Sequence, residues 1–265
     1  MIQQETTVLW NRPVGTDCFC LGLSADHEFS KAVPGQFVMV QVGTEEKSLL
    51  RRPFSISGLI GHGRGFQGIE LLIKVVGAGT ERLGQIQTGE PLNVIGPLGH
   101  GFRLGSEHTR VYLAGGGIGI APIRFLASAL IRRGVPATRM RLFLGGQRKQ
   151  DLLCREDFES HGISVTVTTD DGSEGDQCLI TDPLEQAIAD QAPDMVYACG
   201  PHGMLACVAG IAERTRTPCQ VSIETLMACG LGVCLGCAVE SVKDPDIYLH
   251  ACVHGPVFNA QEIKL

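Results

Sequence analysis

Long apolar runs and blocks of like charge are both missing from this sequence. No apolar run approaches the ~18 residues that a membrane-spanning helix needs, so we expect no transmembrane segment. The 22 basic and 28 acidic side chains are interspersed and give a formal net charge of −6, whereas proteins that bind nucleic acid or anionic membranes normally carry a concentrated basic patch. The N-terminus, "MIQQETTVLW", has neither the basic start nor the apolar core of a signal peptide. We therefore expect a cytoplasmic protein that binds neither nucleic acid nor membrane.

Internal repeats and low-complexity linkers are also missing. The 265 residues are 44% hydrophobic and 19% charged, which is typical of a globular protein long enough for two domains of about 100–200 residues each. The chain does contain 11 cysteines, but a reducing cytoplasm would keep them from forming a disulfide framework. Seven are scattered through apolar or amphipathic stretches, where a buried small residue is the usual interpretation. These seven are Cys18, Cys20, Cys154, Cys178, Cys199, Cys207 and Cys219.

The first hundred residues have the pattern of short β-strands. Residues 36–42, 69–76 and 91–96 are rich in Val and Ile, and turns containing Gly and Pro separate them. Apart from one turn of helix around "GTERLGQI", no stretch shows helical periodicity. This spacing predicts an antiparallel barrel or sandwich.

From about Arg110 the pattern changes to alternating strands and helices. Strands are predicted at 110–115, 141–146, 163–169 and 195–200, and helices at 121–134, 181–191 and 203–215. Thr181 or Asp182 is the expected N-cap of the second of these helices. Such alternation predicts βαβ units around a parallel sheet. After Glu224 the pattern dissolves into a tail rich in cysteine.

The tail sequence "LMACGLGVCLGC" (226–237) is the strongest chemical signal in the chain. Cys229, Cys234 and Cys237 are spaced C-x4-C-x2-C, and Cys252 follows, which is the spacing of a plant-type [2Fe–2S] site. The glycines between them would allow backbone N–H groups to approach sulfur closely. A zinc ribbon would more often show two C-x2-C pairs, and a redox pair would need only two thiols. The spacing therefore favours the cluster, with zinc and coincidence as alternatives.

Two glycine motifs lie at predicted strand ends. "GGGIGIAP" (115–122) connects a strand to a helix, where backbone N–H groups can hold a pyrophosphate. It departs from G-x-G-x-x-G because Ile120 occupies the last glycine position, so a simple tight turn is an alternative. "CGP" (199–201) ends another strand of the predicted sheet, and ligands bind at the carboxyl edge of such sheets.

"RRPFSIS" (51–57) is a third candidate binding segment. Its arginine could bind a phosphate, Phe54 could pack against a planar ring, and Ser55 could donate to a ring nitrogen. An edge strand with an ordinary surface arginine is the alternative. "GAGT" (77–80) could be a second phosphate loop or a simple turn.

In this order, the motifs resemble those of the ferredoxin–NADP reductase superfamily. The C-terminal C-x4-C-x2-C-x14-C pattern is similar to that of the electron-transfer subunits of type B dihydroorotate dehydrogenase, and the match covers essentially the whole chain. The resemblance implies an α/β plus β protein in three parts. These are an FAD-binding antiparallel β-barrel (1–104), a NAD-binding parallel α/β domain (105–221) and a [2Fe–2S] subdomain (222–265).

The resemblance also implies the cofactor-binding residues. On the flavin side they are Arg52, Pro53, Phe54, Ser55, Leu72, Ile73, Lys74, Gly79 and Thr80. On the nicotinamide side they are Gly115, Gly116, Gly117, Ile118, Gly119, Cys199, Gly200 and Pro201. The implied cluster ligands are Cys229, Cys234, Cys237 and Cys252.

Some positions depart from the family pattern or leave a choice open. Lys74 stands where arginine is common, which keeps the charge and loses the planar fork, and Cys178 stands where relatives often have glycine. Arg148 and Lys149 could meet the 2′-phosphate of NADP, but an exposed turn is their more common role, so NAD is the expected acceptor.

The resemblance implies that electrons pass from an FMN-containing dihydroorotate dehydrogenase partner, through the cluster and FAD, to NAD⁺ in pyrimidine biosynthesis. A heterotetramer with two of each subunit is expected, with the cysteine-rich tail facing the partner. Hydride transfer needs no acid–base residue, so no catalytic side chain is assigned and His100, His202, His250 and His254 are expected to be structural. The alternatives are a subunit of a hydrogenase or transhydrogenase-like flavoprotein, a stand-alone iron–sulfur flavin reductase, and a zinc-stapled binding protein.

Overall fold

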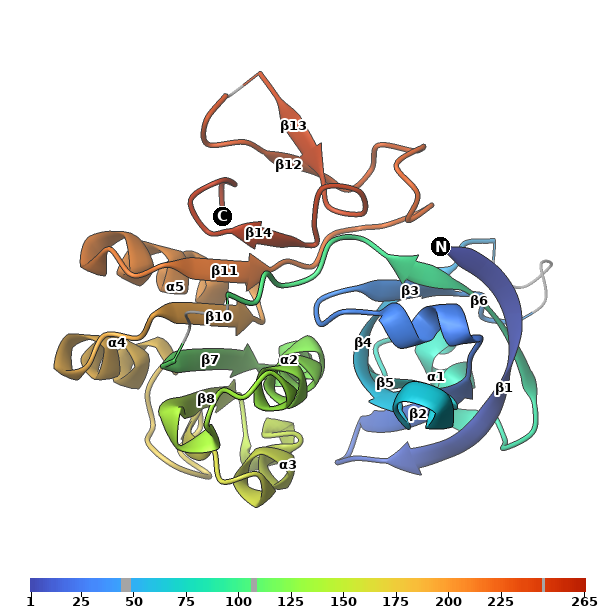
Figure 1. Ribbon diagram of the computed structural model, residues 1–265, viewed down its shortest axis with the longest axis horizontal. Helices are drawn as coiled ribbons and strands as arrows, with labels where there is room; N and C mark the ends of the chain where they lie inside the picture. The colour runs from blue at the N-terminus through green and yellow to red at the C-terminus, as the bar shows by residue number, and fades with distance from the viewer. Residues whose placement is uncertain (44–48, 106–108, 245) are drawn as a thin grey trace.

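The computed structural model describes residues 1–43, 49–105, 109–244 and 246–265. A closed β-barrel forms the N-terminal part, a helix-covered sheet forms the central part, and the C-terminal tail lies along the edge of that sheet (Figure 1). The fold class predicted from the sequence is confirmed.

The barrel closes in the order β1-β2-β5-β4-β3-β6 with antiparallel pairing throughout. Apolar residues alternate along its strands, so that Ile69, Leu71 and Ile73 of one strand fill the interior. The predicted runs at 36–42, 69–76 and 91–96 correspond to three of the strands. The strands are β1 (Ile2–Pro13), β2 (Cys18–Ser24), β3 (Phe37–Val40), β4 (Arg52–Ile60), β5 (Gly68–Lys74) and β6 (Pro91–Leu98), with helix α1 (Ala78–Gln85) and the 3₁₀ turns η1 (His27–Lys31) and η2 (Gly63–Gly65) between them.

The central sheet has the order β14-β11-β10-β7-β8-β9. Five of its strands are parallel, as predicted: β7 (Val111–Gly116), β8 (Met140–Gly146), β9 (Ser164–Thr169), β10 (Met195–Cys199) and β11 (Cys219–Ser222). The α-helices are α2 (Ile120–Arg132), α3 (Arg155–Ser160), α4 (Thr181–Asp190) and α5 (His202–Thr215), and the 3₁₀ turns are η3 (Gly117–Gly119), η4 (Ala137–Arg139) and η5 (Lys149–Asp151).

One helix boundary differs from the prediction. The N-cap of α4 is Ile180, so Thr181 and Asp182 already lie in the first turn, and the expected cap at either of them was wrong. Ile180 is 5% exposed and packs in the core with Leu184. Burial of this apolar residue therefore sets the helix start in place of a polar cap.

The sixth strand of the sheet comes from the cysteine-rich tail. After the hairpin of β12 (Ala238–Glu240) and β13 (Tyr248–His250), β14 (Val257–Asn259) pairs antiparallel with β11. The sheet is therefore mixed at this edge, which the prediction of a parallel sheet did not include. Phe258 is 4% exposed and anchors this strand in the core beneath α4 and α5.

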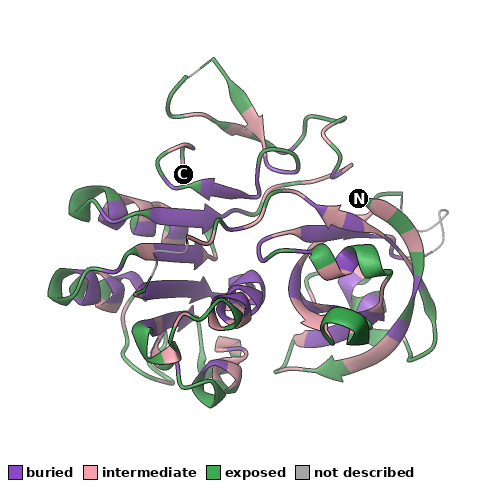
Figure 2. Cartoon of the chain, viewed as in Figure 1, coloured by how far each residue is buried: buried purple, intermediate pink, exposed green. Residues whose placement is uncertain are grey.

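All three hydrophobic cores cross the boundaries between the three parts, and the barrel core itself contains Phe125 of α2. One contains Phe37 and Met39 of the barrel together with Cys237 and Cys252 of the tail. Another joins Leu72 of the barrel to α2. The strands β7, β8, β10 and β11 are almost wholly buried, whereas the edge strand β9 is only partly buried (Figure 2). None of the helices in the described ranges has the length and hydrophobicity of a membrane-spanning segment.

Candidate flavin, nicotinamide and cluster site

A cavity of about 1520 Å³ lies where the barrel, the central sheet and the tail meet. Its volume exceeds that of ordinary small-molecule pockets, about 300–1,000 Å³, and leaves room for more than one large ligand. Two of the predicted cofactor-binding residues, Gly79 and Gly115, are not among the lining residues. The predicted residues that do line it are Arg52, Pro53, Phe54, Ser55, Leu72, Ile73, Lys74, Thr80, Gly116, Gly117, Ile118, Gly119, Cys199, Gly200 and Pro201.

Two adjacent arginines at the start of β4 have different environments. Arg51 donates to the Asn93 side chain at 2.6 Å and to the Asn93 carbonyl at 3.1 Å, so it braces β4 against β6. Arg52 is exposed, lines the cavity and donates to the Leu50 carbonyl at 2.9 Å. The sequence motif alone could not say which of the two guanidinium groups faces a ligand. The structure puts only Arg52 of the pair in the cavity wall.

"GAGT" forms the start of helix α1, which agrees with the turn of helix predicted around "GTERLGQI" and differs from a simple turn. Gly79 and Thr80 lie in the first turn of α1, and the Thr80 hydroxyl accepts hydrogen bonds from the Val76 and Gly77 N–H groups at 2.8 and 3.2 Å. A Cβ on Gly79 would lie 3.9 Å from the Arg52 Nε atom. The start of an eight-residue helix and a guanidinium therefore lie together, and both favour a bound anion such as a pyrophosphate.

The glycine loop of the central sheet is shaped by its neighbour. A Cβ on Gly119 would lie 2.4 Å from the Cys199 carbonyl oxygen, and a Cβ on Gly116 would lie 2.7 Å from Pro201. Parallel pairing of Cys199 with Gly115 brings the two strand ends together. The glycines thus allow "GGGIGIAP" and "CGP" to pack directly on each other. Gly117, with φ +52° and no neighbour within 4 Å of a built Cβ, is the open position of the loop.

Cys199 is a protonated thiol at neutral pH. Burial raises its pKa to about 12, although a hydrogen bond with Ser222 works in the opposite direction. Its position in the cavity wall therefore presents a neutral, polarisable group.

The four tail cysteines form two pairs. Cys237 and Cys252 are 2% and 4% exposed with their sulfurs 3.2 Å apart. Cys229 is half-buried, Cys234 is exposed, and their side chains are in hydrogen-bonding contact. A two-iron cluster with four cysteine ligands takes two thiolates on each iron, and this pairing fits it. Among the residues that the structure describes, no three His, Cys, Asp or Glu side chains are placed to hold a single metal ion.

Backbone N–H groups point at the sulfurs of the tail. Leu231 and Cys234 donate to Cys229 Sγ at 3.3 and 3.4 Å, and Gly232 donates to Cys252 Sγ at 3.1 Å. Burial opposes ionisation of Cys229, but these donors stabilise its thiolate and lower the pKa to about 6. N–H groups directed at thiolate sulfur are the surroundings that cysteine-bound iron–sulfur clusters require.

Residues of the tail complete the cavity wall, both inside and outside the cysteine motif at 226–237. Met227, Ala228 and Gly236 belong to that motif, and Glu224 precedes it. The only sequence signal for Glu224 was its position just after a buried strand. The loop that carries the cysteines is therefore a wall of the cavity that the flavin and nicotinamide motifs also line.

A closed antiparallel barrel followed by a parallel α/β sheet, with arginine and glycine motifs around a shared cavity, defines a flavin- and nicotinamide-dependent reductase. Family models agree: residues 7–102 match an oxidoreductase FAD-binding domain, 113–210 an oxidoreductase NAD-binding domain, and 224–264 the iron–sulfur cluster binding domain of dihydroorotate dehydrogenase B. Among solved structures, that of the NADH-dependent reduced ferredoxin–NADP oxidoreductase superposes with a TM-score of 0.84 at 27% identity, covering 98% of this chain and 89% of the other.

Curated relatives identify a family within this class of reductases. The dihydroorotate dehydrogenase B (NAD(+)) electron transfer subunit of Caldanaerobacter subterraneus subsp. tengcongensis is 36% identical over 262 residues, 98% of each chain. The probable counterpart from Methanopyrus kandleri is 39% identical over 232 residues, 87% of this chain and 80% of its own. This chain belongs to the family of dihydroorotate dehydrogenase B electron transfer subunits, and the resemblance inferred from the sequence is confirmed.

Proposed function

We propose that this chain carries electrons from a catalytic dihydroorotate dehydrogenase subunit, through a [2Fe–2S] cluster and FAD, to NAD⁺ in pyrimidine biosynthesis. The observation that carries the proposal is the shared cavity, in which the flavin motif, the nicotinamide motif and the cysteine loop form different walls. A bound flavin exchanges two electrons with a nicotinamide and one at a time with an iron–sulfur centre. A single cavity bounded by all three motifs is the arrangement that such an exchange needs.

Each part of the chain would hold one group. Arg52 and the start of α1 would bind the FAD pyrophosphate, with Gly79 allowing their close approach, while Pro53 to Ser55 and Leu72 to Lys74 would line the flavin. Gly115 to Gly119 and Cys199 to Pro201 would form the nicotinamide side, and the four tail cysteines would bind the cluster. The domain boundaries 1–104, 105–221 and 222–265 are proposed on the same basis, and the family models fall within them.

The charges near β8 and β9 favour NAD over NADP. Lys149 pairs with Glu174 at 3.1 Å, and Glu174 also pairs with Arg155 at 3.0 Å. The cavity wall at this edge includes the carboxylates of Asp151 and Asp170. Carboxylates repel a 2′-phosphate and can accept hydrogen bonds from a ribose hydroxyl. Lys149 therefore already has an anionic partner in Glu174. The nearby carboxylates disfavour binding of the 2′-phosphate that distinguishes NADP from NAD.

The partner is proposed to be an FMN-containing catalytic subunit, in a heterotetramer of two of each chain. Apolar side chains around the exposed Cys234 support docking at this end of the molecule, because Leu226, Val233 and Leu235 are 88%, 79% and 58% exposed. A cytoplasmic location is proposed because none of the eleven cysteines forms a disulfide, as expected in a reducing compartment.

The test uses the full chain with its flavin and cluster, alone and with the co-purified partner. We expect dihydroorotate-dependent NAD⁺ reduction only in the complex, and NADH-to-dye activity in the chain alone. Cys234→Ser should abolish the first activity and leave the second largely intact, while Cys178→Ser, outside the tail, should change neither. Dihydroorotate oxidation by the chain alone would contradict the proposal, and a colourless preparation would favour a zinc-stapled protein. Capture of a different dehydrogenase or a hydrogenase from the native cell would favour another partner.

A further inference from the structure

We propose, on the basis of the function proposed above, that Arg124 is a positioning residue that sets the approach of the nicotinamide to the flavin. It bridges Glu70 of the barrel and Asp157 of the α/β domain, and so adds a directed polar link to the apolar packing between the two bodies that carry different walls of the cavity.

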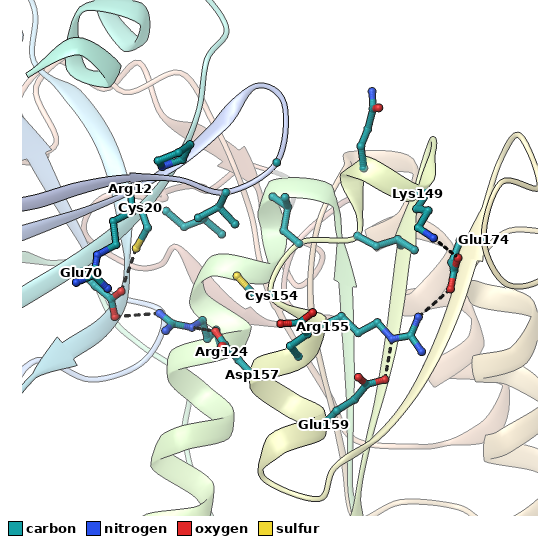
Figure 3. Close-up of a pocket in the computed structure, with 18 of the residues that line it drawn as sticks. Arg12, Cys20, Glu70, Arg124, Lys149, Cys154, Arg155, Asp157, Glu159 and Glu174 are labelled. Atoms are coloured by element: carbon teal, nitrogen blue, oxygen red, sulfur yellow. Dashed lines mark hydrogen bonds and ion pairs between the residues drawn. The ribbon is translucent and has the colours of Figure 1, made fainter.

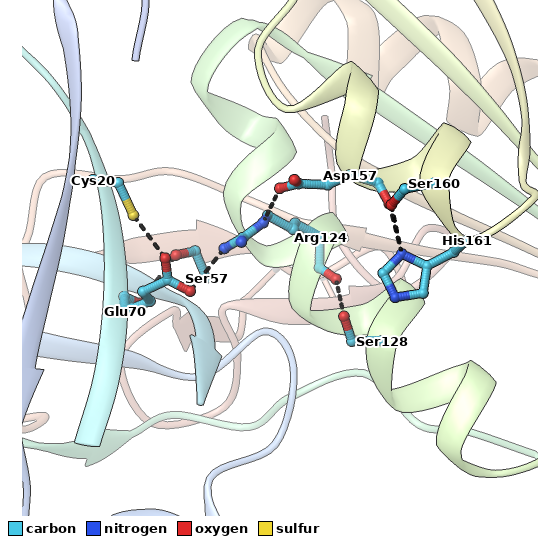
Figure 4. Close-up of polar contacts among 8 residues, drawn as sticks. All are labelled: Cys20, Ser57, Glu70, Arg124, Ser128, Asp157, Ser160 and His161. Carbon is cyan, nitrogen blue, oxygen red and sulfur yellow. Dashed lines mark hydrogen bonds and ion pairs between the residues drawn. The ribbon is translucent and has the colours of Figure 1, made fainter. Parts of the chain in front are cut away.

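The bridge consists of directed, half-buried contacts (Figure 4). Arg124 Nη1 donates to Glu70 Oε2 at 3.0 Å, and Arg124 Nε donates to Asp157 Oδ2 at 2.5 Å. The other Glu70 oxygen accepts a hydrogen bond from the Cys20 thiol at 3.0 Å. Side-chain exposure is 26% for Arg124 and 19% for Glu70. The planar guanidinium thus presents separate donors to two carboxylates on different elements, which a lysine could not reproduce.

The two faces of β5, the barrel strand that carries Glu70, have different contacts. Ile69, Leu71 and Ile73 point into the barrel, so the alternate residues of β5 face outward. Leu72 packs into the core built around α2, and Lys74 approaches Asp151 at 4.0 Å. The outward face of β5 therefore contacts the α/β domain, beside β4, against which α2 packs.

The bridge lies close to both walls of the cavity. Glu70 precedes Leu72, Ile73 and Lys74 on the same strand, at about 3.4 Å per residue, so the flavin wall begins within ~10 Å. Arg124 follows Gly119 by five residues at the start of α2, at about 1.5 Å per residue, so the glycine loop lies within ~10 Å. A strand and a helix are stiff at these lengths, and a shift at the bridge is carried to the reacting groups.

The cleft beside the bridge is better explained as a domain boundary than as a ligand site. This cleft, about 670 Å³ in volume, lies between the barrel and the α/β domain (Figure 3). Most of its basic side chains are paired with acidic ones in the same wall, as Arg155 is with Glu159 at 2.7 Å and with Glu174 at 3.0 Å, and Arg12 lies over the Trp10 ring at 5.0 Å. The cleft also contains Trp10, which is the only tryptophan of the chain and a native probe of this boundary.

Hydride transfer is sensitive to small shifts between the two bodies that the bridge links. Reacting atoms must approach to about 3–3.5 Å, and a misplacement of ~1 Å can slow a reaction about 10²-fold. The nicotinamide motifs all belong to one body and the flavin motif to the other. Loosening the bridge should therefore slow transfer without weakening the binding of either cofactor.

The experiment compares Arg124→Gln with Arg214→Gln in the full chain loaded with flavin and cluster. Arg214 forms an exposed ion pair with Glu185 at 2.6 Å, within the α/β domain, and serves as the matched control. Stopped-flow reduction of the flavin by NADH gives the limiting rate and the dissociation constant separately. For Arg124→Gln we expect the limiting rate to fall about 10- to 100-fold, with the dissociation constant and flavin content within about twofold of the parent chain. Trp10 emission should shift to the red and become more accessible to acrylamide.

A second pair of variants keeps the test independent of folding. The double variant Glu70→Gln with Arg124→Gln removes both charges and leaves no unpaired carboxylate on the barrel; it should still lose rate and expose Trp10. Arg124→Lys should recover only part of the rate, since one ammonium cannot reproduce the fork. An unchanged limiting rate and unchanged Trp10 emission in the folded variants would overturn the inference. If the parent chain itself fails to accept hydride from NADH, the proposed function is wrong, and the Trp10 signal still reports on the bridge.

Discussion

Substitution of Gly230 by alanine tests whether the cysteine loop is fixed by direct packing on the barrel. Gly230 directly follows Cys229 and has φ +72°, and a Cβ built there would lie 2.5 Å from Met39 Cγ and 2.8 Å from Met39 Sδ. Met39 belongs to β3 and is fully buried. It cannot swing out to solvent, so either the loop or the strand must shift.

The expected cost has two sources. An L-residue in the left-handed region costs about 1–2 kcal/mol, and forcing extra atoms into a packed core costs about 1–3 kcal/mol. Alanine also restricts the unfolded chain more than glycine does, which offsets about 0.4–1 kcal/mol of this cost. We expect a net destabilisation of about 1–4.5 kcal/mol, concentrated at the cysteine loop. Gly210→Ala, on α5 with only the flexible end of Arg214 nearby, should be neutral or slightly stabilising.

The assay is the temperature at which the visible absorbance of the cluster bleaches, read beside the far-ultraviolet circular dichroism. A protein with several cofactors does not unfold in two states, so the two midpoints are compared between variants. Gly230→Ala should lower the bleaching midpoint more than the midpoint for secondary structure. In a Met39→Ala background the packing part should vanish and only the backbone part, about 1–2 kcal/mol, should remain. An equal cost of Gly230→Ala in both backgrounds would refute the role of the Met39 contact.

Three further predictions concern single side chains. Tyr112→Phe removes the donor to the Gln191 carbonyl at 2.8 Å, and should cost about 1–2 kcal/mol in denaturant unfolding of the α/β domain, whereas an unchanged midpoint would mean that water replaces the hydroxyl. Arg52→Ala should weaken FAD retention about 10- to 100-fold, as for a lost charged hydrogen bond. Substitution of the exposed Arg64 by alanine should not weaken it, and equal FAD occupancy in both variants would identify Arg52 as an ordinary surface residue. In the metal-free chain, the pKa of Cys229 is lowered to about 6. Its alkylation by iodoacetamide, measured by peptide mass spectrometry, should therefore be rapid at pH 7 and slow down as the pH drops through 6. An ordinary thiol would show the midpoint of this rate change at about pH 8.5.

The parts of the fold that sequence reasoning captured are those with a periodic signal. The Val and Ile content of 69–76 between turns identified β5, and the 3.6-residue pattern in 121–134 identified α2. The cysteine spacing identified the tail because ligand spacing is itself a geometric constraint. By contrast, β14 has three residues, too few for any period. Its antiparallel pairing with β11 depends on tertiary packing of Phe258.

Gly79 and Thr80 of "GAGT" were predicted as phosphate-binding residues, and the Thr80 hydrogen bonds show how the helix there begins. The residues that the sequence missed are important because of where the fold places them. Arg124 occupies a helix position where any polar residue fits the amphipathic pattern. Its importance follows from Glu70, which lies 54 positions away in the sequence and adjacent in space. Glu224 likewise became a wall residue only once β11 and the tail were placed.

The tail is integrated into the fold and is more than an appended cluster module. Its last strand completes the central sheet, the Ile223 N–H donates to the Pro256 carbonyl at 3.0 Å, and the His100 N–H at the end of the barrel donates to the Gly255 carbonyl at 2.6 Å. Cys237 and Cys252 share a core with Phe37, which also lines the flavin cavity. The separation of the cysteine loop from the flavin wall is therefore set by a packed core, which resists deformation. In the proposed electron path the cluster and flavin need no domain movement to meet, and on the nicotinamide side the Arg124 bridge adds a directed polar contact to the apolar packing of α2 on the barrel.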